Sequence, residues 1–205
     1  MPTKTKPSKR DAILDATLDL IVERGFHDAP MSLISERSGA SAGVIYHYFD
    51  SKEAIIHALY ERLHTLKRSH LLAGYTPEME AREALLLIWT NMYHFFRKHS
   101  REMRFLKQYE HAGFECSPEK GDETDPIRLE MERRFRSRSK GGELNELPPE
   151  VIFELTFGVV ERLAQQPKKL SSEDLRKTAE KVWEAIRADD TAPPASNLHR
   201  QPGKR

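Results

Sequence analysis

The chain has 205 residues, of which 38% are hydrophobic and 32% are charged, and its formal net charge is +1. This size allows one domain of ordinary length with a small additional module, and it excludes a large multidomain enzyme. The net charge is too low for a uniformly basic nucleic-acid-binding domain, so composition alone does not indicate DNA binding.

Simple counts also exclude several kinds of segment and site. No window of about eighteen apolar residues occurs, so we expect no membrane-spanning helix. Four basic residues stand within the first ten, but charged residues interrupt the apolar stretch that follows, which argues against a secretory signal peptide. Cys116 is the only cysteine, so an intramolecular disulfide and a multi-cysteine metal cluster are excluded. We therefore expect a cytoplasmic protein.

Apolar residues recur at helical spacing along almost the whole chain, and no stretch alternates with period two for long enough to form a strand. The predicted fold class is all-α. A first helix is expected over 9–24, with Ser8 as its N-cap and Gly25 after its end. Two short helices follow, over 31–38 and 41–49. Two short helices joined by a tight turn that contains glycine are typical of a helix-turn-helix.

Longer helices are predicted to follow this motif. Asp50 is expected to cap the first of them, and Thr76 with Pro77 is expected to begin the second. The predicted ranges are 51–70, 77–98, 101–111, 125–140, 149–164 and 172–188. The tail over 189–205 is rich in proline and polar residues and is expected to be disordered.

The helix over 41–49 carries the residues that we expect to meet DNA. Ala42, Ile45 and Phe49 are spaced to share one face, which should pack on the first helix. The opposite face would then be free. Gly43 and Val44 are small enough for that face to enter a major groove, where Val44 would touch a thymine methyl group.

Polar groups beside the free face are expected to hold the DNA backbone. Tyr46, His47 and Tyr48 offer donors to phosphate oxygens, and the helix amides that follow Ser41 offer a positive helix end. Lys52 would bind a flanking phosphate, a contact that positions the protein without specifying sequence. An ordinary structural role is also open for each side chain: the tyrosines could pack, His47 could face solvent, and Lys52 could pair with an acid.

This set of residues resembles a known module. It consists of Gly25-Phe26, Ile34, Gly39, Ser41, Ile45-Tyr46, Tyr48-Phe49 and Ser51-Lys52-Glu53. Over roughly residues 9–60, the spacing of this set resembles that of the DNA-binding module of TetR-family transcriptional regulators. The resemblance implies a homodimer that binds the half-sites of a palindromic operator and leaves DNA when a small molecule binds the C-terminal domain.

The implied organisation is a helix-turn-helix DNA-binding domain over 1–50, together with the start of the linking helix to about residue 60. An effector-binding and dimerisation domain follows over 51–188, built as a helical bundle.

The chain departs from the family pattern around the second helix. Pro30 stands where the family usually has threonine, Leu33 replaces a common polar residue, and Ser35 replaces alanine. Ser32 is therefore a separate candidate for a base or phosphate contact. These changes leave the orientation of the second helix open.

Aromatic residues on two consecutive helices suggest a place for an apolar or aromatic effector. They are Trp89, Tyr93, Phe96, Phe105 and Tyr109. Ligand pockets are mostly apolar with a few polar groups, but aromatic residues at helical spacing are also typical of an ordinary core. The sequence does not identify the effector.

The helices over 149–164 and 172–188 are expected to form a dimer interface of four helices, two from each chain. Each carries an apolar stripe, and the wider one, over 149–164, is expected to serve both the domain core and a second copy. The stripes consist of Val151, Ile152, Leu155, Val159, Val160 and Leu163, and of Leu175, Ala179, Val182, Trp183 and Ile186.

No catalytic residues, cofactor or metal site are predicted, and the preferred interpretation is a transcriptional repressor rather than an enzyme. None of the nine histidines occurs in a His-x-x-x-His pair. His94, His99, His111 and Cys116 could still gather into a metal or thiol sensor. An architectural DNA-binding protein without an effector and a bundle that binds only proteins also remain open.

Overall fold

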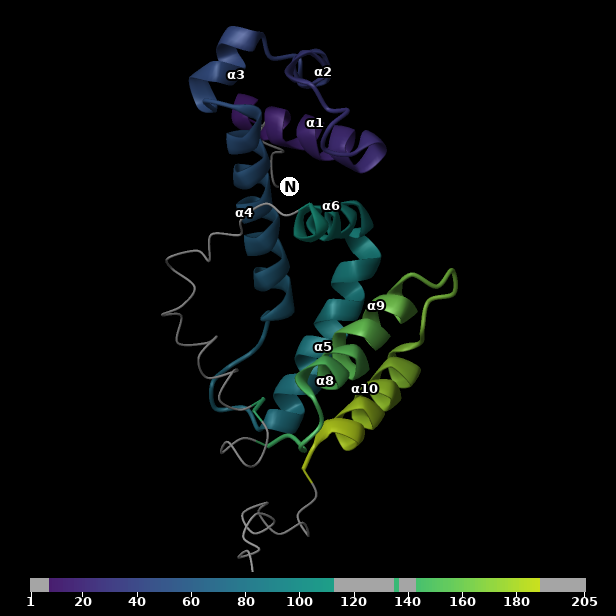
Figure 1. The fold of residues 1–205 in the computed structure, drawn as a ribbon. Helices are drawn as coiled ribbons and strands as arrows, with labels where there is room; N and C mark the ends of the chain where they lie inside the picture. Colours follow the sequence, from purple (N-terminus) through teal and green to yellow (C-terminus); the bar gives the residue numbers. More distant parts are fainter. Residues whose placement is uncertain (1–7, 113–134, 137–142, 189–205) are drawn as a thin grey trace, which may run out of the picture. The chain divides into compact units, whose positions relative to one another are not determined.

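The computed structural model describes residues 8–112, 135–136 and 143–188, and within these ranges the regular elements are all helices (Figure 1). The all-α prediction is therefore confirmed. The chain divides into two compact units, one within residues 1–70 and 95–116 and the other within residues 71–94 and 117–205. The tail over 189–205 lies outside the described residues. So does the helix predicted over 125–140, apart from Phe135 and Arg136, which form a turn and a bend.

Five helices build most of the first unit. They are α1 (Lys9–Arg24), α2 (Met31–Ser38), α3 (Ala42–Tyr48), α4 (Lys52–Leu71) and α6 (Ser100–His111). The predicted cap of α1 is present, because Ser8 Oγ accepts a hydrogen bond from the Asp11 N–H at 3.1 Å. Gly39 ends α2 in the left-handed conformation at φ 63°, which glycine adopts without steric cost.

The apolar faces of these helices meet in one core. Ile13 of α1, Ile34 of α2, Ile45 of α3, Leu59 of α4 and Phe105 of α6 are each completely buried. Burial of one such side chain contributes about 1.5–3 kcal/mol, so this core rather than any local signal fixes how α3 is rotated about its axis.

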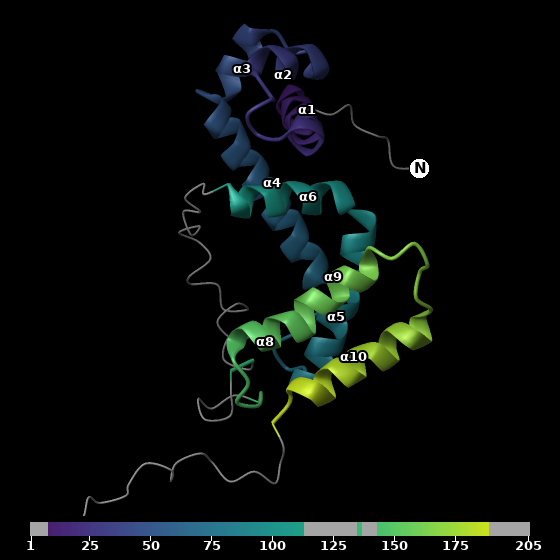
Figure 2. The same ribbon diagram turned by 45° about the vertical axis from the view of Figure 1, so that its right-hand side comes forward.

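The second unit contains α5 (Ala81–Lys98) up to His94, followed by α8 (Pro149–Phe153), η2 (Glu154–Gly158), α9 (Val159–Ala164) and α10 (Ser172–Ile186). The helix predicted over 149–164 is present, but its middle, η2, is a π-helical turn. Figures 1 and 2 both show α10 running beside α8 and α9. Ser171 caps α10, with its Oγ accepting from the Asp174 N–H at 3.0 Å.

Two predicted helix starts are wrong. The hydroxyl of Ser51, not the carboxylate of Asp50, accepts from the first turn of α4, with Ser51 Oγ 3.1 Å from the Ala54 N–H. α5 begins at Ala81 rather than at Pro77, because residues after Thr76 form a separate turn. The burial of Ala81 and of the next turn of α5 outweighs the local proline signal. Among the described residues, no helix is long and apolar enough to cross a membrane.

Candidate nucleic-acid interface and apolar cavity

α3 presents one face to the core of the first unit and the other to solvent. Ile45 is fully buried and Val44 is half-buried against the same core. Tyr48 is exposed at the end of the helix, and Ala42, Gly43, Tyr46 and His47 are exposed along its length. Spacings of three and four residues place these four positions on one side of the helix.

The prediction that Ala42 packs inward is wrong. The core contact of α3 is centred on Val44 and Ile45, and this rotates Ala42 outward. The half-buried position of Val44 leaves its methyl groups less open to a base edge than the sequence suggests. Ala42, which sequence reasoning missed, now offers the exposed methyl group that can meet a thymine.

Gly43 has open space around it. A Cβ atom placed there would meet no heavy atom within 4 Å, so crowding inside this chain does not require glycine. The missing side chain instead allows another molecule to approach the backbone of α3 closely. This is the property that the sequence predicted for a helix entering a groove.

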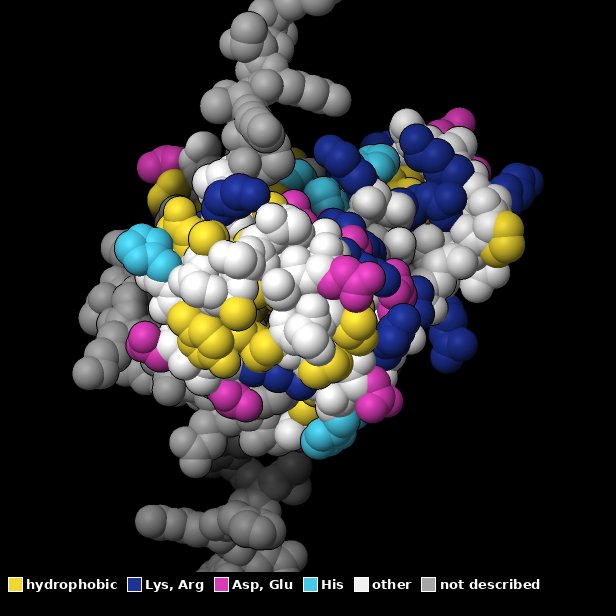
Figure 3. All heavy atoms as spheres, turned by 90° about the horizontal axis from the view of Figure 1, so that it is seen from above, with side chains coloured by type: hydrophobic (Ala, Val, Ile, Leu, Met, Phe, Trp, Pro, Cys, Tyr) yellow, Lys and Arg dark blue, Asp and Glu magenta, His cyan; other side chains and the backbone are white. Residues whose placement is uncertain are grey.

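The two tyrosines of α3 are both accessible, Tyr46 at 55% and Tyr48 at 42%. Figure 3 shows hydrophobic side chains, a class that there includes tyrosine, gathered on the face seen from above Figure 1, with Lys and Arg side chains beside them. A tyrosine combines an apolar ring with a hydroxyl that usually finds a partner. The edge of His47 packs on Tyr48 with ring centroids 5.1 Å apart, so these side chains support each other.

Serine and lysine side chains complete the candidate interface. Ser41 Oγ caps α3 by accepting from the Val44 N–H at 3.4 Å, which leaves the serine hydroxyl proton free to donate outward. Ser32 is exposed in the first turn of α2. Lys52 Nζ donates to the Phe26 carbonyl at 2.5 Å, and two of the three ammonium donors remain for other partners.

Basic side chains from the start of α1 also lie beside α3. The Arg10 guanidinium stands 5.3 Å from the ring centroid of Phe49, directly after α3. Lys9 Nζ donates to the Gly39 carbonyl in the turn before α3 at 3.3 Å. The fold therefore brings positive charge to both ends of this helix, which favours a polyanionic partner.

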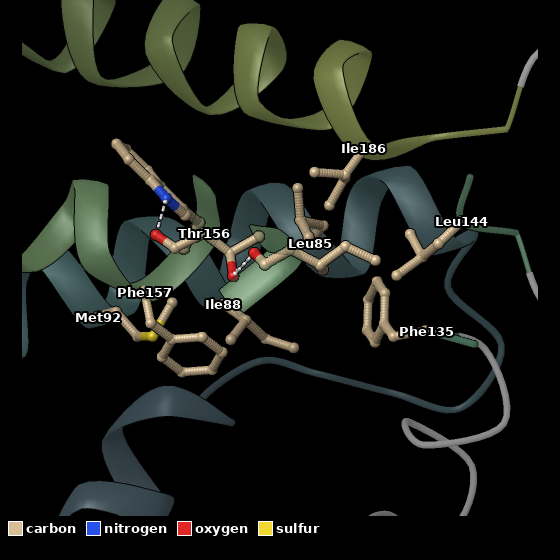
Figure 4. A pocket seen from close by; sticks show the side chains of 10 residues that line it. Leu85, Ile88, Met92, Phe135, Leu144, Thr156, Phe157 and Ile186 are labelled. Atoms are coloured by element: carbon tan, nitrogen blue, oxygen red, sulfur yellow. Dashed lines mark hydrogen bonds between the residues drawn. The ribbon is translucent and has the colours of Figure 1, made fainter. Parts of the chain in front are cut away.

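The second unit contains an apolar cavity of about 150 Å³ (Figure 4). α5 supplies Leu85, Ile88, Trp89 and Met92 to its wall, and Thr156 and Phe157 of η2 supply part of the rest. In Figure 4, Met92 and Phe157 lie at one end, and Phe135 and Leu144 lie at the other.

The polar groups of this cavity already have partners within the chain. The Trp89 Nε1–H donates to the Thr156 carbonyl at 3.1 Å, and Thr156 Oγ1 donates to the Ile152 carbonyl at 2.7 Å. These bonds tie α5 to η2 and leave a surface of rings, methyl groups and one thioether.

In the described part of the chain, the aromatic set predicted for an effector site is divided between the two units. Trp89 lines the apolar cavity, whereas Tyr93 is buried with its hydroxyl accepting from the Leu170 N–H at 2.8 Å. Phe96 is half-buried and is not part of the lining. Phe105 and Tyr109 belong to the core of the first unit, because α6 packs on α1 there.

Two family models match the chain. Bacterial regulatory proteins of the tetR family match residues 13–59, and the tetracyclin repressor-like C-terminal domain matches residues 83–187. The chain belongs to the TetR family. It is therefore a helix-turn-helix transcriptional regulator that binds DNA, and not an enzyme.

Full-length relatives agree with this assignment. An uncharacterized HTH-type transcriptional regulator of Haemophilus influenzae is 24% identical over 188 residues, which is 89% of this chain and 98% of the relative. A TetR-family regulator of known structure from Haemophilus influenzae Rd is 25% identical with a TM-score of 0.69, covering 88% and 97% of the two chains. One from Marinobacter aquaeolei VT8, at 18% identity and a TM-score of 0.75 over 88% and 96%, shows the same fold.

A more identical relative matches only in part. The HTH-type transcriptional regulator BetI of Klebsiella pneumoniae is 45% identical over 53 residues, which is 26% of this chain and 27% of BetI. The similarity thus spans about a quarter of the length of that relative and about a quarter of this TetR-family regulator.

The predicted apolar stripes of this TetR-family regulator divide between core and surface. Leu175, Ala179 and Ile186 of α10 are buried within the chain. The outer side of α10 carries ion pairs instead, such as Lys177–Glu173 at 2.6 Å. The exposed apolar side chains lie on the neighbouring segment and are Val151, Phe153 and Phe157, at 40%, 56% and 39% exposure.

The histidines do not build a metal site in the described part of this TetR-family regulator, where no three potential ligands come together. His99 stacks on Phe95 with ring centroids 4.6 Å apart and meets the edge of His70 at 5.1 Å. Burial lowers the pKa of His99, although the Glu102 carboxylate nearby acts in the opposite direction. Cys116 lies outside the described residues.

Proposed function

We propose that this TetR-family regulator is a cytoplasmic repressor that binds a palindromic operator as a homodimer and leaves it when a small apolar effector binds. The observation that carries the proposal is the outward face of α3. Ile45 and Phe49 anchor the helix in the core, and Ala42, Gly43, Tyr46 and His47 stay open to a groove.

The roles proposed on this face follow from exposure. Base edges are approached by Gly43, Val44 and the outward-facing Ala42. Phosphates are bound by Ser41, Tyr46, His47 and Tyr48. Ser32 and Lys52 flank them from the neighbouring helices. Two copies of α3 would bind adjacent major grooves if they are held roughly 34–36 Å apart, one helical turn of DNA.

The proposed dimer places the exposed apolar side of α8 and η2 against a second copy. Phe153 and Phe157 stack with ring centroids 5.0 Å apart and form the centre of this surface. Ion-paired residues of α10, rather than its buried apolar stripe, would then supply a polar rim. An isologous contact of this kind gives the twofold symmetry that a palindromic operator needs.

The effector would act through the cavity of the second unit. A ligand shifts a regulator between states only by its difference in affinity for them, and coupling of about 1–3 kcal/mol changes operator affinity by about 5- to 150-fold. The cavity wall includes η2, which also carries the exposed Phe157 and directly follows the exposed Phe153 of α8. This shared segment supports coupling between ligand binding and the proposed interface.

The test is selection of bound sequences from random DNA with the purified full chain at moderate salt. A palindromic consensus with a high specificity ratio is the expected result. Binding without sequence preference would instead support an architectural protein, and no salt-dependent binding would support a bundle that contacts only proteins.

A further inference from the structure

The cavity of the second unit restricts the chemistry of its occupant. None of the described residues that line it is charged, and Thr156 and Trp89 use their polar side-chain hydrogens on carbonyl groups of η2 and α8. Thr156 is also 6% exposed, so its hydroxyl is shielded from water. The wall thus offers an occupant little beyond dispersion and ring contacts.

We infer that this cavity binds an uncharged, largely apolar molecule about the size of one aromatic ring. Its volume of about 150 Å³ equals that of dry apolar cavities that accept benzene. The inference rests on the proposed function for its regulatory meaning, because it names the chemical class of the effector. The binding itself is measurable without DNA.

A charged group is excluded by desolvation. A carboxylate or ammonium that leaves water must find a paired charge or several hydrogen bonds, and the described residues of these walls supply neither. An aromatic hydrocarbon loses no hydrogen bonds on entry. It gains contacts with the rings of Trp89 and Phe157 and with the Met92 thioether, which favours ring edges.

A matched series of one-ring compounds tests this inference. Toluene, phenol, benzoate and benzylammonium are titrated into the full chain by calorimetry. Toluene is expected to bind, and benzoate and benzylammonium are expected to bind at least about a hundredfold more weakly. Equal or tighter binding of either ion, or no binding of toluene, would overturn the inference.

Neighbouring leucines of α5 provide matched variants that locate the binding. Leu85 lines the cavity, whereas Leu86 is half-buried and lies outside its wall. Leu85→Phe should reduce toluene affinity at least about tenfold by filling the space, and Leu86→Phe should leave it unchanged. Equal losses in both variants would overturn the assignment to this cavity.

Two further variants keep the test decisive if Leu85→Phe does not fold. Thr156→Val removes a hydroxyl that donates to the Ile152 and Phe153 carbonyls, so toluene affinity should be kept and benzoate still rejected. Loss of toluene binding in this variant would contradict the inference.

Trp183→Phe leaves Trp89 as the only tryptophan of the chain, and the fluorescence of Trp89 should respond to toluene. An unresponsive Trp89 in a toluene-bound chain would place the ligand elsewhere.

Operator affinity is then measured with and without toluene. Binding of toluene together with unchanged operator affinity would support the ligand class and overturn the effector response in the proposed function. Release of the operator by toluene, lost in Leu85→Phe and kept in Leu86→Phe, is the result expected if both are correct.

Discussion

The ammonium group of Lys52 has two tasks in the proposed complex, because it holds the Phe26 carbonyl at 2.5 Å and still has donors for a phosphate. Lys52→Met should weaken binding to all DNA sequences alike and reduce the salt slope of log affinity by about one. Loss of the bond to Phe26 should also lower the free energy of unfolding by about 1 kcal/mol. Anisotropy titrations over a range of salt concentrations and thermal melting measure the two effects.

Lys168→Met is the matched control for this change. Lys168 is exposed between α9 and α10, so the variant makes the same change in net charge far from α3 in the sequence. Its salt slope should equal that of the unmodified chain. A Lys52→Met slope that is also unchanged would remove Lys52 from the interface.

A substitution at Gly43 should affect stability and DNA binding in opposite directions, because a side chain added there meets open space within this chain. Gly43→Leu should fold and should raise the free energy of unfolding by about 0.5–1 kcal/mol, since glycine disfavours a helix. The same side chain should abolish operator binding by blocking close approach of α3. Unfolding and electrophoretic mobility shift are measured on the same preparation. Full operator affinity in Gly43→Leu would show that this face does not enter a groove.

The junction of α5 and α6 carries a group sensitive to pH. Burial lowers the pKa of His99 from its usual value of 6.5; Glu102 opposes this shift, while His70 and Lys98 add to it. The unfolded chain therefore binds the proton more readily than the folded chain, and stability should fall as the pH drops below 6.5.

Thermal melting between about pH 7.5 and 5.5 measures this dependence. His99→Gln should show a shallower loss of melting temperature on acidification, whereas His27→Gln, at an exposed position of the first unit, should match the unmodified chain. A slope unchanged in His99→Gln would assign the pH dependence to other groups.

The helices show which local signals can be trusted. Ser8 caps the helix that the sequence assigns to it, because a cap needs only residues close in the chain, and Ser41 and Ser171 cap α3 and α10 in the same way. The start of α5 and the π turn of η2 were not predictable. Both depend on which residues the second unit buries, and a regular 3.6-residue pattern does not reveal an inserted residue.

At the scale of the whole molecule, the proposed dimer depends on an apolar surface of α8 and η2. Phe153 is 56% exposed, and burial of one such ring contributes about 1.5–3 kcal/mol. Phe153→Glu should weaken self-association at least about tenfold and weaken operator binding with it. Sedimentation velocity measures the assembly.

Thr65→Glu adds the same charge at an exposed position of α4 in the first unit and should leave the assembly unchanged. A Phe153→Glu chain that sediments like the unmodified one would move the interface elsewhere.

The sequence by itself determined the all-α class, most helix ends and the family, because periodicity, caps and motif spacing are local properties of the chain. Only the tertiary structure decided which side chains these helices leave exposed. Ala42 turns outward, Val44 turns partly inward, and Phe105 with Tyr109 joins a different core from Trp89. The physical reason is that the rotation and partners of a helix follow from burial of apolar surface contributed by distant segments, which spacing along one helix does not contain.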